Sequence, residues 1–140
     1  MPILNVQLNT SCYAQTALAD FMQKATAVFA ETLGAPIDRI RVYLHDVPPQ
    51  HMLIGGKAPD AVGGDAPFFQ FYLLAGRPPE HRDALLVAFT DLLVECLGVE
   101  RSVIRGFCSH IDPNDWSVAG VPAGQKRAQE IAARAQSEQS

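Results

Sequence analysis

The first part of the chain has the apolar spacings of a strand, a helix and a second strand. Residues 2–8 are apolar or alternate with polar side chains over the length of a strand. Between 13 and 33, apolar residues recur every three or four positions, and Gly34 followed by Pro36 predicts that the helix stops there. From 39 to 44 every second residue is apolar, which predicts a strand with one apolar and one polar face.

The same order of elements recurs in the second part. Residues 67–74 have the composition of a strand, apolar residues between 85 and 96 indicate a helix that ends at Gly98, and 103–108 form another strand candidate. Equivalent residues keep a nearly constant separation: Pro2 and Pro67 are 65 residues apart, whereas Gly34 and Gly98, and Arg41 and Arg105, are each 64 apart. This regularity predicts a tandem duplication of a β-α-β unit.

Two such units predict an α+β fold with a four-stranded sheet and two helices on one face. Strands joined by a helical crossover are parallel neighbours with a right-handed connection. The opposite sheet face would be bare, which implies oligomerisation or a covering element. We expect a single domain over 1–140, with module one at 2–60, module two at 65–121 and a C-terminal tail helix at 122–140.

Composition excludes several classes of function. The net charge of -4 and the scattered Lys and Arg residues give no basic stripe, so no nucleic-acid partner is expected. No run of about 18 apolar residues and no signal-peptide pattern occurs, so we expect a soluble, cytoplasmic protein without a membrane partner. The three cysteines and four histidines lack metal-ligand spacing, and neither a disulfide framework nor a metal site is expected.

A proline follows the initiator methionine. A residue this small after Met1 permits removal of the methionine, and Pro2 would then carry a free secondary amine. An α-amine titrates near 8, and burial beside guanidinium groups lowers its pKa further, so the amine becomes a general base or nucleophile near neutral pH. The competing interpretation is that position 2 merely tolerates proline, as it does in unrelated proteins.

Both halves of the chain resemble the subunit of the 4-oxalocrotonate tautomerase family. The matching segments are Leu33–Pro36, Ile40–Val42 and His51–Gly56 in the first half, and the strand opened by Pro67, Leu74–Pro78, Ile104–Arg105 and Trp116–Gly120 in the second. The two-module length is similar to the macrophage migration inhibitory factor, cis-3-chloroacrylic acid dehalogenase and malonate semialdehyde decarboxylase branches. The segment Asn114–Ser117 and the pair Asp38–Arg39 look closest to the decarboxylase branch.

The resemblance implies a homotrimer with Pro2 at a pocket between modules or subunits. Arg77 matches the family arginine that binds a substrate carboxylate, a task that suits a planar bidentate guanidinium. Arg41 matches the arginine that polarises a carbonyl or binds a second carboxylate, and Arg39 shares its strand face. Arg105 is the duplicate of Arg41, and either could reach a pocket.

The pocket walls and a possible water-activating acid also follow from the resemblance. Met52 stands at the position of an apolar active-site residue, Trp116 is its second-half counterpart, and Phe107 completes the apolar wall. Asp38 matches the water-orienting carboxylate of the decarboxylase branch, although an aspartate exposed in a turn is the alternative. Cys12 replaces the arginine that module one would carry, so Arg77 is the copy that remains.

The resulting hypothesis is a cofactor-independent tautomerase of small 2-oxo or 2-hydroxy-enoic acids, with Pro2 as general base and a small carboxylate substrate. The first alternative is a malonate semialdehyde-type decarboxylase or hydratase, in which Asp38 activates water and protonated Pro2 is an acid. The second is a non-catalytic binding module in which Pro2 is vestigial.

Overall fold

The computed structural model describes residues 2–126, 128 and 132. The first unit contains β1 (Ile3–Leu8), α1 (Gln15–Leu33) and β2 (Arg41–Asp46), and the second contains β3 (Phe68–Leu74), α2 (Pro79–Leu97) and β4 (Arg105–Ile111). A small hairpin of β5 (Ser117–Val118) and β6 (Val121–Pro122) follows. Short 3-10 turns connect these elements, and one of them, Ile37–Arg39, leads directly into β2.

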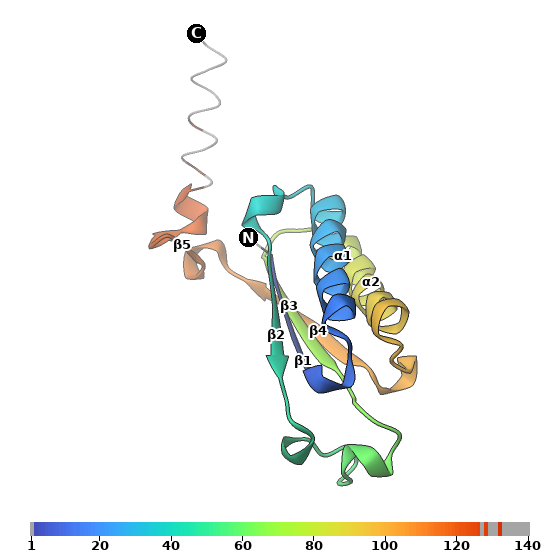
Figure 1. Cartoon of the computed structure of the whole chain (residues 1–140). Helices are drawn as coiled ribbons and strands as arrows, with labels where there is room; N and C mark the ends of the chain where they lie inside the picture. Colours follow the sequence, from blue (N-terminus) through green and yellow to red (C-terminus); the bar gives the residue numbers. More distant parts are fainter. Residues whose placement is uncertain (1, 127, 129–131, 133–140) are drawn as a thin grey trace.

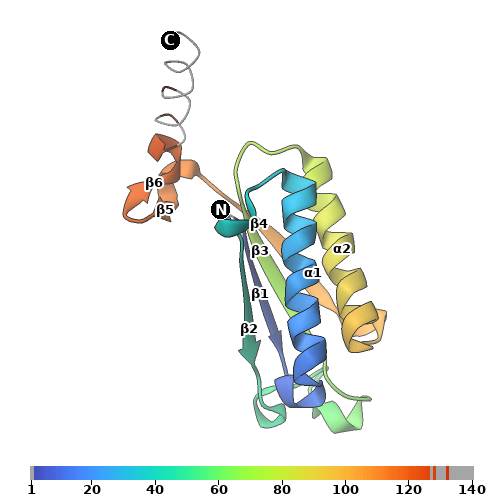
Figure 2. The ribbon, with the colours of Figure 1, turned by 45° about the horizontal axis from the view of Figure 1, so that its top comes forward.

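The predicted duplication is confirmed by the sheet. The strand order is β2-β1-β3-β4, with parallel pairs within each unit and an antiparallel β1–β3 pair between the units. Figures 1 and 2 show both helices on one face of this sheet, and no described helix or strand covers the other face. The α+β fold with a four-stranded sheet and two helices on one face is therefore confirmed.

Both helices end where the sequence predicts. Gly34 and Gly98 adopt left-handed conformations, with φ of 63° and 68°, which glycine reaches without a steric penalty. The first strand of each unit pairs with the second strand of that unit in the same way. Arg41 N donates to Pro2 O at 3.1 Å in the first unit, and Arg105 N donates to Pro67 O at 3.3 Å in the second. Each copy of the unit therefore begins at a proline beside an arginine.

The core lies between the helices and the central strands. Alternate residues of β1 and β3 are buried, and they include Leu4 and Phe71. The ring of Phe29 on α1 lies 4.9 Å from that of Phe89 on α2 and 6.2 Å from that of Phe71, with edge-on geometry in both pairs. Aromatic packing thus joins the two helices to each other and to the sheet.

The structure differs from the sequence expectations at element ends. Helix α2 begins at Pro79, because proline is well suited to a first helical turn, and β4 continues to Ile111 along β3. Val121–Pro122 pairs with β5, so the predicted tail helix does not begin at 122; residues 123–126 are helical, and most of the predicted 122–140 helix lies outside the described residues. Among the described residues, no helix is long and apolar enough to cross a bilayer.

Candidate active site

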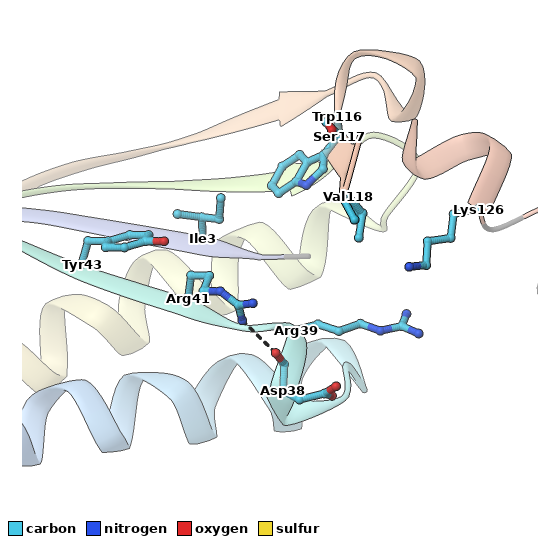
Figure 3. A pocket seen from close by; sticks show the side chains of 10 residues that line it. Ile3, Asp38, Arg39, Arg41, Tyr43, Trp116, Ser117, Val118 and Lys126 are labelled. Carbon is cyan, nitrogen blue, oxygen red and sulfur yellow. Dashed lines mark hydrogen bonds between the residues drawn. The ribbon is translucent and has the colours of Figure 1, made fainter. Parts of the chain in front are cut away.

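A cavity of about 540 Å³ opens where the start of β1 meets the segment that follows β4. These segments are adjacent because β4 runs antiparallel to β1, so its carboxyl end lies at the amino end of β1. Figure 3 shows side chains from the two units facing this space. The lining residues are Ile3, Asp38, Arg39, Arg41, Tyr43, Trp116, Ser117, Val118, Ala119 and Lys126.

Pro2 lies beside this cavity, although it is not one of the lining residues, and its carbonyl oxygen accepts a hydrogen bond from Arg41 N at 3.1 Å. Pro2 is buried, and its neighbour Ile3 lines the cavity. Arg41 Nη1 donates to the carbonyl oxygens of Asp38 at 2.8 Å and Ile40 at 3.2 Å (Figure 3). These two bonds orient the guanidinium through a single nitrogen, so its other donors are available to a ligand.

The indole of Trp116 forms part of the opposite wall. It is carried by the segment before the β5–β6 hairpin, and Figure 3 shows it above Ile3. Ala123 is buried, and its N–H donates to Trp116 O at 2.7 Å, so the chain after the hairpin is tied back to the wall. Trp116 and Ile3 thus give the cavity an apolar wall.

The polar lining is mainly cationic. Among the described residues, the lining includes the cationic Arg39, Arg41 and Lys126 and one acidic residue, Asp38. The sequence predicts the two arginines and Asp38 as site residues, whereas Lys126 falls in the predicted tail helix. No sequence motif identifies this lysine as a pocket residue. A predicted hairpin at Val118–Val121 would have indicated that the chain turns back toward the pocket.

A second, smaller cavity of about 290 Å³ surrounds Pro67. Its lining includes Met52, Leu53, Phe68, Val103 and Arg105. Arg105 Nη1 donates to the carbonyls of Ser102 at 2.8 Å and Ile104 at 3.0 Å, which repeats the bonding of Arg41. Two of the predicted pocket residues, Met52 and Arg105, therefore lie at this copy of the site and do not line the cavity beside Pro2.

Phe107 lies on the bare sheet face and lines neither cavity. Its ring is 5.5 Å from that of Phe68, and its side chain is 44% exposed. The strand register places Phe107 opposite Gln70, which in turn pairs with Asn5. Phe107 thus lies on the uncovered face, on the edge strand β4.

Arg77 lies at the end of α1, on the helix side of the sheet. Its Nη1 donates to Leu33 O at 3.0 Å, and this carbonyl is one of those that a helix end leaves without an intrahelical donor. The loop that carries Arg77 follows β3 and so lies at the same end of the sheet as Pro2. The arginine is not among the residues that line the cavity in this protomer.

The cysteines are poor candidates for a nucleophile. All three are free thiols. Loss of contact with water raises the pKa of Cys12, Cys96 and Cys108 above its usual value, so the unreactive thiol form prevails at neutral pH. In the part of the chain that the structure describes, no three His, Cys, Asp or Glu side chains are grouped as metal ligands.

Comparison with known proteins identifies both units. A family model described as "Tautomerase enzyme" matches residues 2–61 and again 67–126. The 2-hydroxymuconate tautomerase of Comamonas testosteroni is 35% identical over 57 residues, which are 41% of this chain and 90% of that protein. The 2-hydroxymuconate tautomerase of Pseudomonas putida is 30% identical over a segment of the same length.

Solved structures match over both units together. A native fused 4-OT is 26% identical with a TM-score of 0.79, and the match covers 88% of this chain and 97% of that one. A wild-type fused 4-OT that is a symmetric trimer is 32% identical with a TM-score of 0.78, over 87% of this chain and 98% of that one. The family model matches each of the two units, and the fold is shared with a fused 4-OT. The chain therefore belongs to the tautomerase family, as a fusion of two of its β-α-β units.

Proposed function

We propose that this protein is a cofactor-independent tautomerase of small 2-oxo or 2-hydroxy-enoic acids, with Pro2 as general base after removal of Met1. One observation carries the proposal: Pro2 is buried beside Ile3 and Arg41, and these two residues line a cavity together with Arg39 and Lys126. Burial and nearby cations both disfavour an ammonium ion, so the pKa of the amine falls from its ordinary value near 8. Relatives named 2-hydroxymuconate tautomerase support the same substrate class.

The proposed reaction moves one proton between two positions of the substrate. The Pro2 amine removes the proton from the enol oxygen, the electron pair moves through the conjugated chain, and the resulting ammonium returns a proton to carbon. Arg41 stabilises the negative charge on the dienolate oxygen. Trp116 and Ile3 keep water away, which strengthens these electrostatic interactions.

Arg77 would serve a pocket of another copy of the chain. The proposal follows from its place at the end of α1, outside the cavity of its own protomer, together with the trimeric state of several structural relatives. In a homotrimer the end of α1 that carries Arg77 would lie against the cavity of the next subunit. In that arrangement Arg77 would bind the substrate carboxylate with a bidentate pair of hydrogen bonds.

The decarboxylase or hydratase alternative rests on the position of Asp38. Asp38 lines the cavity together with Arg39 and Arg41 (Figure 3). The pH profile separates the two mechanisms, because a base requires neutral Pro2 and an acid requires its ammonium form. Activity that falls below the Pro2 pKa supports the tautomerase, and activity that falls above it supports the alternative.

The first prediction concerns Arg41. With the N-terminus verified by intact mass, the protein is assayed on 2-hydroxymuconate, phenylenolpyruvate and malonate semialdehyde. Arg41→Ala should reduce kcat/KM for the enol acids by on the order of 100-fold, because the developing oxyanion loses its main donor. Arg105→Ala should have a much smaller effect, since its cavity surrounds Pro67, whose nitrogen is an amide without a basic lone pair.

Two outcomes would overturn the proposed function. One is equal loss of activity in both arginine variants, which would mean that Arg41 has no special relation to the Pro2 site. The other is a purified protein that retains Met1, because the Pro2 nitrogen would then be acylated and could not act as a base.

A further inference from the structure

The turn of chain after β6 is bonded to Trp116, the residue whose indole forms one wall of the cavity. Ala123 is buried, and its N–H donates to Trp116 O at 2.7 Å. This bond continues by one residue the hairpin in which Ser117 pairs with Pro122. Proline has no N–H to donate to its partner strand. The bond from Ala123 therefore closes the open end of the hairpin, at the residue that carries the indole.

The same turn packs closely against the chain on the other side of Trp116. A Cβ built on Gly124 would lie 3.1 Å from Asn114 Oδ1 and 3.3 Å from Pro113 Cβ. Both atoms belong to the 3-10 turn Pro113–Asp115, which directly precedes Trp116. A larger side chain at 124 would press the two turns apart. Gly124 thus allows the chain after the hairpin to lie against the chain before it.

The equivalent segment of the first unit, which the structure describes in full, has neither this donor nor this glycine. The residues 64 positions before Trp116, Ala123 and Gly124 are Met52, Pro59 and Asp60. Pro59 has no N–H to donate to Met52 O, and Asp60 is exposed. The contacts that hold the apolar wall therefore occur at the copy of the site whose proline can become a free amine.

We propose that Ala123 and Gly124 are positioning residues of the active site, which act by holding Trp116. The indole then lies over Ile3 and gives the cavity beside Pro2 an apolar wall (Figure 3). This role rests on the proposed function, because the cavity is taken as the active site. Neither positioning residue lines the cavity, so both act through the indole. Electrostatic stabilisation of a dienolate oxygen is stronger where such a wall limits the access of water.

Tryptophan fluorescence tests this role without a substrate, because Trp116 is the only tryptophan of the chain. Ala123→Pro removes the donor and introduces the residue that module one has, and proline suits the first position of a helical turn. The emission of this variant should shift to longer wavelength, and acrylamide should quench it more strongly than in the parent protein. Gly124→Val should cause the same changes through its packing contact.

Pro59→Ala is the matched control. It makes the reverse exchange at the equivalent turn of module one, and Pro59 does not line the cavity beside Pro2. Its emission and quenching should equal those of the parent protein. Far-UV circular dichroism verifies that each variant is folded, and Gly124→Val decides the case if Ala123→Pro does not fold. Parent-like emission and quenching in the folded turn variants would overturn the positioning role.

Kinetics test whether the turn acts through the indole. Ala123→Pro should lower kcat/KM for phenylenolpyruvate about fivefold, the factor expected for one neutral hydrogen bond. In a Trp116→Ala background the same substitution should change kcat/KM by less than about twofold, because the wall that it positions is absent. An equal loss in both backgrounds would overturn the positioning role. If the parent protein turns over no enol acid, the tautomerase proposal fails, and the fluorescence still decides whether this turn holds Trp116.

Discussion

Ala119 is strained at the edge of the proposed active site. Among the described residues it is the one non-glycine residue with a positive φ, 54°, and Gly120 follows with φ 84°. Both lie between the paired residues Val118 and Val121, in a two-residue turn that needs positive φ at both positions. The equivalent turn of module one has Gly55 at the first position, with φ 58°.

Exchanging alanine and glycine between these turns should change stability in opposite directions. Ala119→Gly should increase the free energy of unfolding by about 1 kcal/mol, because glycine reaches positive φ without strain, and Gly55→Ala should lower it by a similar amount. Urea denaturation at one fixed protein concentration measures both. A stabilising Gly55→Ala would contradict this account of the two turns.

At the scale of elements, β4 approaches β3 closely at Gly106. This residue pairs with Phe69, and a Cβ built on Gly106 would lie 2.3 Å from the Phe69 ring. The ring is buried and also packs on Phe89 of α2 at 6.0 Å between centroids, so it has little room to move. Glycine at 106 therefore lets an aromatic ring of one strand lie over the backbone of its neighbour.

Gly106→Ala should destabilise the protein by about 1–3 kcal/mol through overpacking. In a Phe69→Leu background the same change should cost at least about 1 kcal/mol less, because the smaller side chain leaves room for the methyl group. A double-mutant cycle on urea midpoints measures this coupling. Additive effects of the two substitutions would show that the Phe69 ring is not the obstacle.

At the scale of the whole molecule, the sheet has one face without a cover. Tyr43 and Phe107 are 48% and 44% exposed on this face, and the register connects them through Asn5 and Gln70 into one row across all four strands. Exposed aromatic residues on a sheet face are typical of an interface between subunits.

A charged side chain introduced on this face should therefore separate the subunits of the proposed assembly. If the proposed trimer forms through this face, Phe107→Glu should shift the molar mass in solution from that of a trimer to that of a monomer, because the carboxylate would be buried without a partner. Val87→Glu is the matched control: Val87 is a 55% exposed apolar residue on α2, and its replacement should leave the assembly intact. Light scattering after size-exclusion chromatography measures both, and an intact Phe107→Glu trimer would exclude this surface from the interface.

Local patterns were sufficient to predict most of the fold. Apolar spacing located the strands and helices, and Gly34 and Gly98 marked both helix ends, because these properties depend on nearby residues. The start of α2 and the β5–β6 hairpin were missed, since Pro79 and the short strands give weak periodic signals. The predicted roles of Pro2, Arg41 and the other site residues stay predictions.

The sequence by itself determined the duplication, the parallel pairing within each unit and the arginine beside each proline, because a repeat at constant spacing reproduces the same local hydrogen bonds twice. Only the tertiary structure decided which distant residues share a cavity. The antiparallel β1–β3 pair carries the chain after β4 back to Pro2, so Trp116 and Lys126 join Arg41, while Met52 and Arg105 gather around Pro67. Such proximity depends on strand direction between the units, and no local pattern of side chains encodes it.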